Sequence, residues 1–424
     1  MALILLAEAR DHVLARCAPR APVPVPLDDA LGCVLAGPVT AAEPVPPWAN
    51  SAMDGYAVRS ADVAGAAEAR PVPLAVVATV AAGAAADIEV GPGQAVRIMT
   101  GAPMPPGADA VVMVERTRGG PDAVVVEVLE PVAAGRNVRD AGSDIAPGQV
   151  VVAGGTLLGP AHLGVLASVN VRRPVVVRRP RLGVISTGDE LVDDDRPLAP
   201  GQIRESNRPM LVALARSFGI DAVDLGTVAD DRAALSSALV EAAATCDAVA
   251  TSGGVSMGDF DLVKVVLGEL ADMRWMQVAI RPAKPFAFGM LDGTPVFGLP
   301  GNPVSSLVSL ALLGVPGLRR LAGRDDLDLP RVSAVAGPGL GRRPDGRTAF
   351  QRVACRWVDG RLHAQPVAGQ GSTSSRPPPM PTPWPSSPTA TASPRATRSR
   401  WCSSLHRPDP ARPRFAVLGR PLGT

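Results

Sequence analysis

Hydrophobic and polar positions change their spacing twice along the chain. Near the start, Ala7, Val13 and Leu14 lie near one face of a helix that should end before the prolines beginning at Pro19. From about residue 31 to 178, apolar positions form short β-rich runs separated by Gly and Pro, as in small sheets or barrels. The clearest runs span residues 72–80, 95–99, 110–114 and 123–129.

From residue 181 strand-like and helix-like runs alternate. The strand-like runs are 181–186, 222–228, 248–252 and 295–299, and the helix-like runs are 208–218, 231–244, 261–270 and 303–314. This βαβ series predicts a mostly parallel sheet covered by helices. A ligand crevice is then expected beyond the carboxyl ends of the strands.

Three turns of this region share one design, in which a strand is followed at once by a loop of small residues and then a helix. They lie in segments 184–190, 251–259 and 298–306. Glycines permit close approach of the backbone, and N–H groups that open a helix attract anions. A single turn of this kind is as often an ordinary connector, but three at one sheet edge favour an anion site.

Acidic side chains are expected at the same edge. They form three pairs, one after each of three strands: Asp189 with Glu190, Asp230 with Asp231, and Asp259 with Asp261. Carboxylates beside an anion site need a cation between them, which predicts Mg²⁺ bridging protein oxygens and a phosphate-bearing ligand. The alternative is helix capping, because Asp230 and Asp259 occupy positions typical of N-caps.

Only Lys264 and Lys284 among the 42 basic residues are lysine. Lys284 follows Arg281 in a stiff, proline-flanked segment, where both cations could meet a phosphate or another oxyanion. A solvated surface loop is the alternative for this segment. Lys264 is expected on the solvent face of its helix.

Two loops of the β-rich region stand out. Segment 47–58 holds Trp48 and the chain's only tyrosine, Tyr56, for which core packing is expected. Segment 97–109 is a long rigid loop that follows a strand and carries Thr100. The residues alone assign no ligand to either loop.

Composition narrows the class of protein. A length of 424 residues predicts two to four domains, and 46% hydrophobic with 19% charged residues excludes a wholly disordered chain. No stretch reaches the roughly 18 uninterrupted apolar residues that a helix needs to cross a bilayer, so a cytoplasmic location without membrane contact is expected. The cysteines and histidines are dispersed, which argues against a disulfide framework and a zinc cluster. The net charge of +2 gives no reason to expect binding of nucleic acid. A nucleotide-dependent kinase is disfavoured because the sequence has no GxxxxGK[ST] loop.

Five motifs, in this order, resemble those of the molybdopterin molybdenumtransferase family, which includes bacterial MoeA and the E-domain of gephyrin. They are residues 50–57 (NSAMDGYA), 100–103 (TGAP), 186–191 (STGDEL), 252–256 (SGGVS) and 299–303 (LPGNP). The resemblance extends to about residue 371. It implies a multidomain fold in which an α/β domain accompanies β-rich domains.

The resemblance also implies domain boundaries and an assembly. The expected parts are a linker and dimerisation domain (1–30 and 141–178), a loop-bearing β-rich domain (31–140), an α/β molybdopterin-binding domain (179–326), an incomplete C-terminal β domain (327–371) and a disordered tail (372–424). An elongated homodimer is implied. Its active site would lie where the α/β domain of one subunit faces the loop-bearing domain of the other.

The implied reaction inserts molybdenum from molybdate into adenylylated molybdopterin, with Mg²⁺ and with release of AMP and molybdenum cofactor. The implied catalytic residues are Asp54, Thr100, Glu190, Asp230, Asp261 and Lys284. The implied metal ligands are Asp144, Glu190, Asp230 and Asp261. The implied binding residues are Ser186, Thr187, Gly188, Asp189, Ser252, Gly253, Gly254, Ser256, Arg281, Pro300, Gly301, Asn302, Pro303 and Ser305.

Two points of the resemblance stay open at the level of sequence. A lysine is common in the family at the position of Arg281. The planar guanidinium group of arginine therefore replaces the compact ammonium group of lysine there. The alternative function is a non-catalytic molybdopterin-binding scaffold of the gephyrin type. Other proteins of molybdenum-cofactor biosynthesis and acceptor molybdoenzymes are the macromolecular partners that the family implies.

The tail departs from the family pattern. Residues 372–424 contain 12 prolines, eight arginines and one acidic residue, a composition typical of disorder. When the codons from Ser372 to Ser404 are read from their last base, with G or C at free positions, the family's alanine-rich run, alternating strands and PxGDGVxxGD-type turn return. We therefore hypothesise a one-base shift near codon 372, either as a mutation or as a sequence error.

Overall fold

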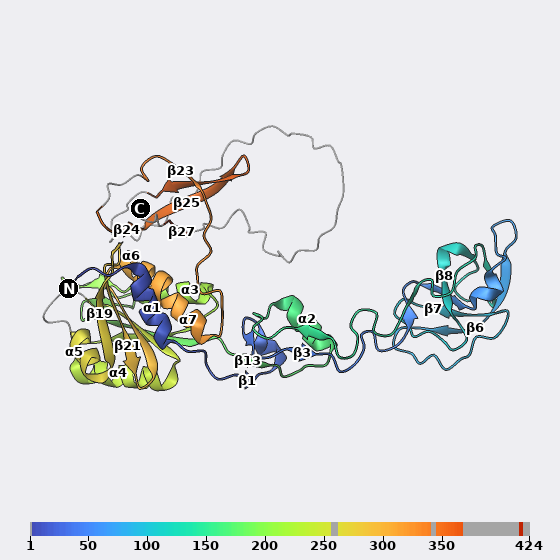
Figure 1. Ribbon diagram of the computed structural model, residues 1–424, viewed down its shortest axis with the longest axis horizontal. Coiled ribbons are helices and arrows are strands. Elements are labelled where there is room, and N and C mark those ends of the chain that lie inside the picture. The colour runs from blue at the N-terminus through green and yellow to red at the C-terminus, as the bar shows by residue number, and fades with distance from the viewer. Residues whose placement is uncertain (1, 256–261, 341–344, 368–414, 419–424) are drawn as a thin grey trace. The chain divides into compact units, whose positions relative to one another are not determined.

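The computed structural model describes residues 2–255, 262–340, 345–367 and 415–418 (Figure 1). The chain divides into two compact units. One comprises Met1–Arg20 with Arg179–Thr424, and the other Ala21–Arg178. The first contains the α/β domain, and the second contains the β-rich region.

The α/β unit is built on a six-stranded sheet with the order β17-β14-β18-β22-β21-β19. Its strands are β14 (Arg181–Thr187), β17 (Asp221–Val228), β18 (Ala248–Ser252), β19 (Asp272–Gln277), β21 (Pro285–Leu291) and β22 (Thr294–Leu299). The first four strands in this order are parallel, as the βαβ pattern predicts. The sheet as a whole is mixed, because β21 and β19 are antiparallel and the alternation did not reveal them.

A tight hairpin explains the reversal of direction. Asp292 and Gly293 join β21 to β22 with φ values of 47° and 83°. Two consecutive positive φ values are typical of the two-residue turns that connect antiparallel strands. The strand at 295–299 was therefore predicted correctly, but it follows an antiparallel neighbour rather than a helix.

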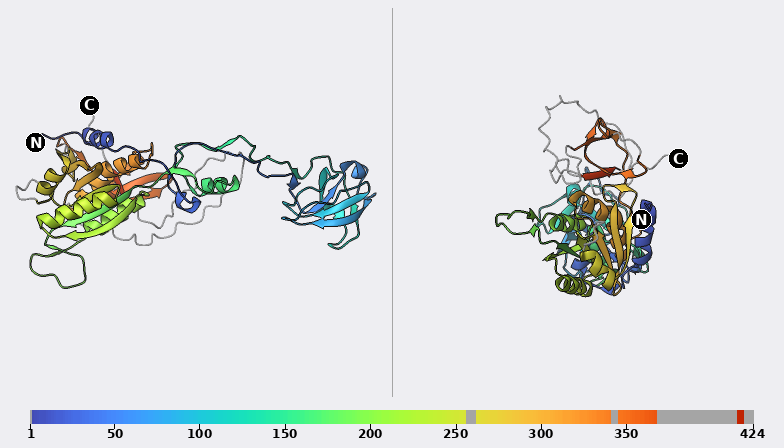
Figure 2. Two further views of the ribbon diagram at one scale, coloured as in Figure 1. Left: turned by 90° about the horizontal axis from the view of Figure 1, so that it is seen from below. Right: turned by 90° about the vertical axis from the view of Figure 1, so that its left-hand side faces the viewer.

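Helices cover both faces of this sheet (Figures 1 and 2). Those on one face are α1 (Leu6–Arg16), α3 (Asn207–Ser217), α6 (Pro303–Ser309) and α7 (Val315–Leu321), with a π-helical turn at Leu310–Gly314. Those on the other face are α4 (Arg232–Thr245) and α5 (Leu262–Leu270). The predicted first helix is present and buries Val13, but its second buried residue is Ala9, whereas Ala7 is exposed.

One helical run in the described part of the chain is long and apolar enough to span a membrane. It covers Pro303–Leu321, and 83% of its apolar window is buried inside the protein. The side chains of Leu310, Leu313 and Leu318 belong to the core of the α/β unit. The run is therefore accounted for as a core helix of this domain.

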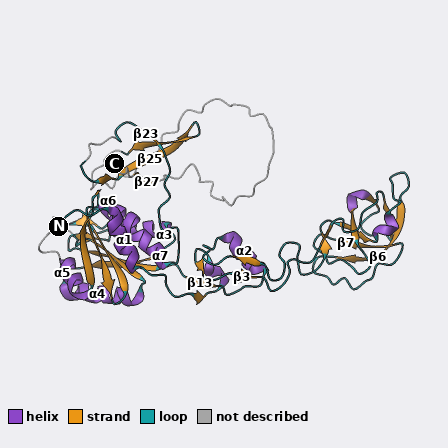
Figure 3. Ribbon diagram, viewed as in Figure 1, coloured by secondary structure: helices purple, strands orange, loops and turns teal. Residues whose placement is uncertain are grey.

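The second unit consists mainly of strands and loops (Figure 3). Its largest sheet has the order β8-β5-β7-β6-β10-β9, with β5 (Gly55–Val58), β6 (Val72–Val80), β7 (Gln94–Ile98), β8 (Ala110–Met113), β9 (Thr117–Arg118) and β10 (Val125–Val128). The four β-rich runs predicted between residues 72 and 129 thus all form strands. Tyr56 packs in the core at 1% exposure, but the expected burial of Trp48 is wrong, because 54% of its surface is exposed.

Smaller sheets complete this unit. They comprise β1 (Val23–Pro24), β13 (Val175–Val177) and β2 (Val34–Leu35); β11 (Val138–Arg139) with β4 (Asn50–Ser51); and β12 (Val150–Val152) with β3 (Val39–Thr40). One α-helix, α2 (Pro160–Ser168), accompanies the short helical turns Leu27–Ala30, Ser60–Val63 and Val114–Arg116. Helix α2 was not predicted.

The C-terminal segment forms a four-stranded sheet with the order β23-β26-β25-β27. Its strands are β23 (Val335–Ala336), β25 (Gln351–Val358), β26 (Arg361–Pro366) and β27 (Phe415–Leu418), and β24 (Thr348–Ala349) pairs with β20 (Ile280–Arg281). Strand β27 belongs to the atypical tail and pairs with β25. Disorder was predicted for residues 372–424, and only β27 of that segment lies within the described residues.

Candidate functional site

The candidate site lies where the order of the parallel strands reverses. The chain runs from β14 to its neighbour β17 and then crosses back to β18, on the other side of β14. The turns that follow β14 and β18 therefore leave the sheet in opposite directions. In open α/β sheets this arrangement creates a crevice beyond the carboxyl ends of the strands.

The three predicted turns meet at this edge of the sheet. The backbone N–H of Gly253 donates a hydrogen bond to the Leu299 carbonyl at 3.1 Å, and that of Gly188 donates to the Val228 carbonyl at 3.4 Å. A Cβ atom on Gly253 would lie 3.3 Å from the Thr187 carbonyl oxygen, and one on Gly301 would lie 3.8 Å from the Gly253 Cα. The turns after β14, β18 and β22 are thus neighbours in space.

Two residues of the middle turn require glycine. Gly253 and Gly254 have φ values of +103° and +75°, in the region that L-residues with side chains rarely adopt. A Cβ atom on Gly254 would also lie 2.1 Å from the Cβ of Val263 at the start of α5. The turn can therefore approach α5 only without a side chain at this position.

The turn after β22 is held by its own polar side chains. Asn302 caps α6, since its Oδ1 accepts a hydrogen bond from the Ser305 N–H at 3.2 Å and lies 3.3 Å from the Ser305 hydroxyl. Pro303 occupies the first position of the helix, where its missing N–H is not needed. The Ser306 hydroxyl donates to the Pro300 carbonyl, and this bond helps to fix the conformation of the turn.

Acidic residues gather beside the turn after β14. The Asp230 backbone N–H donates to Asp189 Oδ1 at 3.0 Å. The side chain of Glu190 folds back over Gly188, where a Cβ atom would lie 2.5 Å from its Oε2. The N-cap role considered for Asp230 belongs to Asp231, whose Oδ1 accepts from the Ala234 N–H at 2.8 Å, so the Asp230 carboxylate does not cap α4.

Four other predicted residues are not among the described members of this cluster. Ser256, Asp259 and Asp261 lie outside the described residues. Asp144 belongs to the β-rich unit, where its side chain is exposed and its backbone N–H donates to the Val45 carbonyl at 3.0 Å.

The carboxylates at this edge could hold a metal ion only together with other ligands. No group of three or more His, Cys, Asp or Glu side chains in the described ranges is arranged to hold a metal on its own. Mg²⁺, however, is usually bound through one or two carboxylates together with water and substrate phosphates. Asp189 and Glu190, with Asp230 beside them in the fold, carry the hard carboxylate oxygens that such a site would use.

The predicted cations occupy different surroundings. Strand β21 runs antiparallel to β22 and begins where β22 ends, so Lys284, which precedes β21, lies at the same sheet edge as the last turn. Lys284 is exposed, and its carbonyl accepts a hydrogen bond from the Val278 N–H at 2.7 Å. Arg281 Nη1 instead lies 3.9 Å from Asp345 Oδ2 in the C-terminal segment.

Ala283 holds an unusual backbone conformation next to Lys284. Five non-glycine residues in the described part of the chain have positive φ, and four of them are Asn or Asp, which tolerate this region. Ala283 is the fifth, with φ +74° and a side chain that is buried in the core of the domain. Packing of its methyl group offsets part of the strain at the residue that leads into Lys284.

The β-rich unit holds a second cluster, around Asp54. Its Oδ1 accepts two hydrogen bonds from Thr100, from the backbone N–H at 2.7 Å and the hydroxyl at 2.8 Å. These bonds stabilise the ionised form and lower the pKa of Asp54. Two further bonds, Gly101 N–H to the Ser51 carbonyl and Ser51 N–H to the Ala102 carbonyl, join the two loops.

Sequence reasoning missed Asn207, the first residue of α3. Its Nδ2 donates to Ser252 Oγ at 2.9 Å and to the Gly301 carbonyl at 2.7 Å, so one side chain links two of the three turns. An asparagine at the start of a predicted helix is usually interpreted as a cap. That interpretation would have hidden its contact with the site.

Arg208, the next residue, was also missed. Its side chain is almost fully buried, with Nε 2.6 Å from Asp224 Oδ1 and Nη2 3.0 Å from Asp193 Oδ2. Burial by itself would lower the pKa of Arg208, but hydrogen bonds to Asp193 and Asp224 outweigh burial and raise it. In return, the hydrogen bond from Arg208 lowers the pKa of Asp193. Arg208 thereby anchors the segment between β15 (Leu191–Val192) and β16 (Ile203–Arg204) to the sheet.

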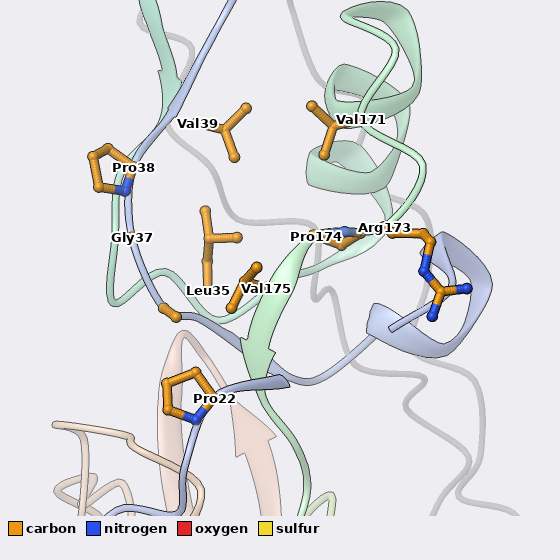
Figure 4. Close-up of a pocket in the computed structure, with 10 residues that line it drawn as sticks. Pro22, Leu35, Gly37, Pro38, Val39, Val171, Arg173, Pro174 and Val175 are labelled. Carbon is orange, nitrogen blue, oxygen red and sulfur yellow. The ribbon is translucent and has the colours of Figure 1, made fainter. Parts of the chain in front are cut away.

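A separate pocket of about 550 Å³ opens in the β-rich unit (Figure 4). Its walls are mostly apolar, and Leu35, Val39, Val171 and Val175 point into it, while the Arg173 guanidinium extends away. None of the predicted site residues lines it. This pocket therefore differs from the candidate site at the sheet edge.

Comparison with known proteins relates both units to one group. The family model for the MoeA N-terminal region (domain I and II) matches residues 4–170, and the model for the probable molybdopterin binding domain matches residues 183–320. The chain is 42% identical over 339 residues to molybdopterin molybdenumtransferase 2 of Mycobacterium tuberculosis, covering 78% of this chain and 83% of that protein. It is 37% identical over 351 residues to molybdopterin molybdenumtransferase of Haemophilus influenzae, covering 82% and 84%.

A solved structure shares the fold. The molybdopterin biosynthesis moeA protein from Pyrococcus horikoshii OT3 superimposes with a TM-score of 0.69 at 29% sequence identity. The superposition covers 88% of this chain and 92% of that chain. The similarity thus extends over both units rather than over the α/β domain alone.

Proposed function

The chain belongs to the molybdopterin molybdenumtransferase family, that of MoeA, and we propose that it transfers molybdenum from molybdate to adenylylated molybdopterin with release of AMP. One observation carries this proposal: three glycine-rich turns meet Asp189, Glu190 and Asp230 at the sheet edge where the strand order reverses. Such an edge can bind phosphate oxygens through donors while carboxylates hold a cation. The reaction requires both.

The turns and the lysine bind the anionic groups of the substrates. Backbone and hydroxyl donors at Ser186, Ser252 and the neighbouring glycines face the phosphates, and Lys284 balances the charge of a phosphate or of molybdate. Binding both oxyanions at one edge holds molybdate near the group that receives its metal. This positioning lowers the entropic cost of bringing the two substrates together.

Carboxylates serve the hydrolytic half of the reaction. Cleavage of the pyrophosphate bond needs a water molecule, which Glu190 or Asp230 would orient and deprotonate. When bound, Mg²⁺ supplies positive charge against the pyrophosphate oxygens and the departing AMP. Asp261 is the further carboxylate that we assign to this group from the family motif.

We further propose that the enzyme acts as a cytoplasmic homodimer. Asp54 and Thr100 of one copy would then face the α/β unit of another, with Asp144 as a further carboxylate. The partly exposed side chains of Trp48 and Met53, beside Asp54, are the kind of apolar surface that a partner or ligand covers. Proteins of cofactor biosynthesis and acceptor molybdoenzymes are the proposed recipients of the product.

Molybdate-dependent release of AMP tests the function directly. The purified full chain should release AMP from adenylylated molybdopterin only when molybdate is present, and chelation of Mg²⁺ should stop the release. Glu190→Ala and Asp261→Ala should abolish turnover while their circular dichroism spectra and melting temperatures stay near the original values. Binding of the substrate without turnover would instead indicate the non-catalytic scaffold.

A further inference from the structure

The orientation of the Asn207 side-chain amide is determined by its neighbours. The contact of 2.7 Å to the Gly301 carbonyl oxygen requires a donor, because a carbonyl oxygen only accepts. The atom at this contact must therefore be Nδ2. The second Nδ2 hydrogen then points to Ser252 Oγ at 2.9 Å.

This orientation leaves Ser252 free to donate. Since its Oγ accepts the bond from Asn207, the hydroxyl hydrogen of Ser252 has no acceptor in the part of the chain that the structure describes. Ser252 is the register partner of Ser186 on the neighbouring strand, so both side chains lie on the α3 face of the sheet. The Ser186 hydroxyl is fully buried and has no hydrogen-bond partner among the described residues.

Two adjacent hydroxyls without acceptors at the switch point call for a ligand with several acceptor oxygens. A buried hydroxyl without an acceptor is unfavourable, and an acceptor oxygen of a ligand would satisfy it. A third buried atom without a partner, Asn207 Oδ1, could accept from a protonated oxygen or from water. A tetrahedral oxyanion matches this set of groups.

We propose that Asn207 is a positioning residue that fixes Ser252 as a hydrogen-bond donor to a tetrahedral oxyanion, either a phosphate or molybdate. By bonding to Gly301 as well, Asn207 also holds the turn after β22 against the turn after β18. The inference rests on the proposed function, because it names how that site holds its anionic ligand.

Two variants separate donor direction from packing. Asn207→Asp keeps the shape of the side chain, but a carboxylate cannot donate to the Gly301 carbonyl and would accept the hydrogen of Ser252. Ser252→Ala removes the donor while leaving the bond between Asn207 and Gly301 intact. Both variants should therefore lose the same hydrogen bond to the oxyanion by different routes.

Calorimetric titration of the full chain with AMP and, separately, with molybdate measures this loss. We expect each variant to raise the Kd of the bound oxyanion by roughly ten- to a hundredfold, the range for a hydrogen bond to a charged group. The double variant should be no weaker than the weaker single variant, because one interaction is lost in all three. A rise confined to AMP assigns the phosphate to Ser252, and one confined to molybdate assigns the metal oxyanion.

Turnover provides a readout that loss of packing would not give. A ground-state contact to the substrate raises KM and leaves kcat within a few-fold, whereas a distorted site lowers kcat. Asn170→Asp is the matched control for charge, since Asn170 is exposed and lies in the β-rich unit, and it should change neither constant. If Asn207→Asp does not fold, Asn207→Ala takes its place: it removes both Nδ2 donors, so the Kd of the oxyanion should rise, and an unchanged Kd would overturn the role of Asn207.

The inference is overturned if Ser252→Ala binds both oxyanions as tightly as the unmodified protein, or if the effects of the two single variants multiply. Different outcomes would refute the role of Ser252 and the proposed molybdenum transfer. A chain that binds oxyanions through Ser252 but releases no AMP from adenylylated molybdopterin would refute the function and keep the inference. A chain that turns over normally with Ser252→Ala would do the reverse.

Discussion

Asp54 Oδ1 accepts hydrogen bonds from both the backbone N–H and the hydroxyl of Thr100, at 2.7 and 2.8 Å. Both bonds favour the carboxylate and lower its pKa. A lowered pKa in the folded state stabilises the fold above the ordinary aspartate pKa of about 3.9, and this stabilisation is lost as the pH falls through the folded value. The pair therefore links the two loops most strongly when Asp54 is ionised.

Thr100→Val removes the hydroxyl and keeps the backbone donor, so we expect the pKa of Asp54 to rise toward its ordinary value. A pH titration of the Asp54 carboxyl carbon by NMR measures this rise. Thr100→Ser, which retains the hydroxyl, should keep the low value. Equal titration curves for the valine and serine variants would show that the hydroxyl does not stabilise the carboxylate.

The glycine at position 254 should tolerate no side chain. Gly254→Ala would force a Cβ to within 2.1 Å of the Val263 Cβ at a φ of +75°, so we expect a loss of about 1–3 kcal/mol in the free energy of unfolding. Gly268→Ala, at an exposed position of α5 with open space around it, should instead stabilise by about 0.5–1 kcal/mol. Urea unfolding of the two variants compares them, and similar effects of both would contradict the close approach of the turn to α5.

The two lysines should differ in function. Lys284→Ala should raise the KM for the anionic substrates roughly tenfold or more, because a charged donor is lost at the sheet edge. Lys264 was expected to face solvent, but it is half-buried, and its Nζ lies 5.9 Å from the centre of the Trp275 ring. Lys264→Ala should therefore cost at most about 1 kcal/mol of stability and leave kcat and KM unchanged. Steady-state kinetics of both variants decide the assignment, which fails if the two lysines behave alike.

Arg208 should contribute to stability in a pH-dependent way. Arg208→Ala leaves the buried Glu205 carboxylate, and the more exposed Asp193 and Asp224, without their shared cation, so we expect a loss of about 1–3 kcal/mol in the free energy of unfolding at neutral pH, most of it from Glu205. Because the arginine lowers the pKa of Asp193, the loss should shrink as the pH falls through the folded pKa of that carboxyl. Urea titrations at several pH values test this, with Arg208→Lys as the variant that keeps the charge. A loss independent of pH would assign the effect to packing alone.

Much of the α/β domain could be predicted because its strands and helices carry their own periodicity. The strands at 181–187 and 248–252 and their glycine turns follow from local pattern, and parallel strands bring such turns to one edge. Strands β19 and β21 were not predicted, because an antiparallel hairpin interrupts the alternation of strand and helix. Local patterns identify elements, but they do not show which neighbour an element pairs with.

The site divides along the same line. Residues within the turns could be named from the sequence, whereas Asn207 lies 45 residues from Ser252 and 94 from Gly301. Such distant contacts arise from tertiary packing and leave no local signature. Likewise, Asp231 rather than Asp230 caps α4 because of the residue at which the helix begins. Helix boundaries inferred from sequence are uncertain by one or two residues.

The hypothesis of a shifted reading frame makes a prediction about the C-terminal sheet. Trp357 on β25 is 67% exposed, and Val335 on β23 is 42% exposed, which leaves apolar surface on a small sheet.

A gene that carries the one-base correction at codon 372 would replace the Pro- and Arg-rich tail with strands able to cover such surface. We expect a higher soluble yield, a higher melting temperature and weaker acrylamide quenching of Trp357. Because the proposed catalytic residues precede codon 372, kcat/KM should change little. A chain ending at residue 371 is the control, since it removes the tail, including β27, without adding new strands. Equal yield, melting temperature and quenching for the corrected and control chains would show that the new strands do not pack on this sheet, and resequencing codons 365–424 would then decide whether the tail is genuine.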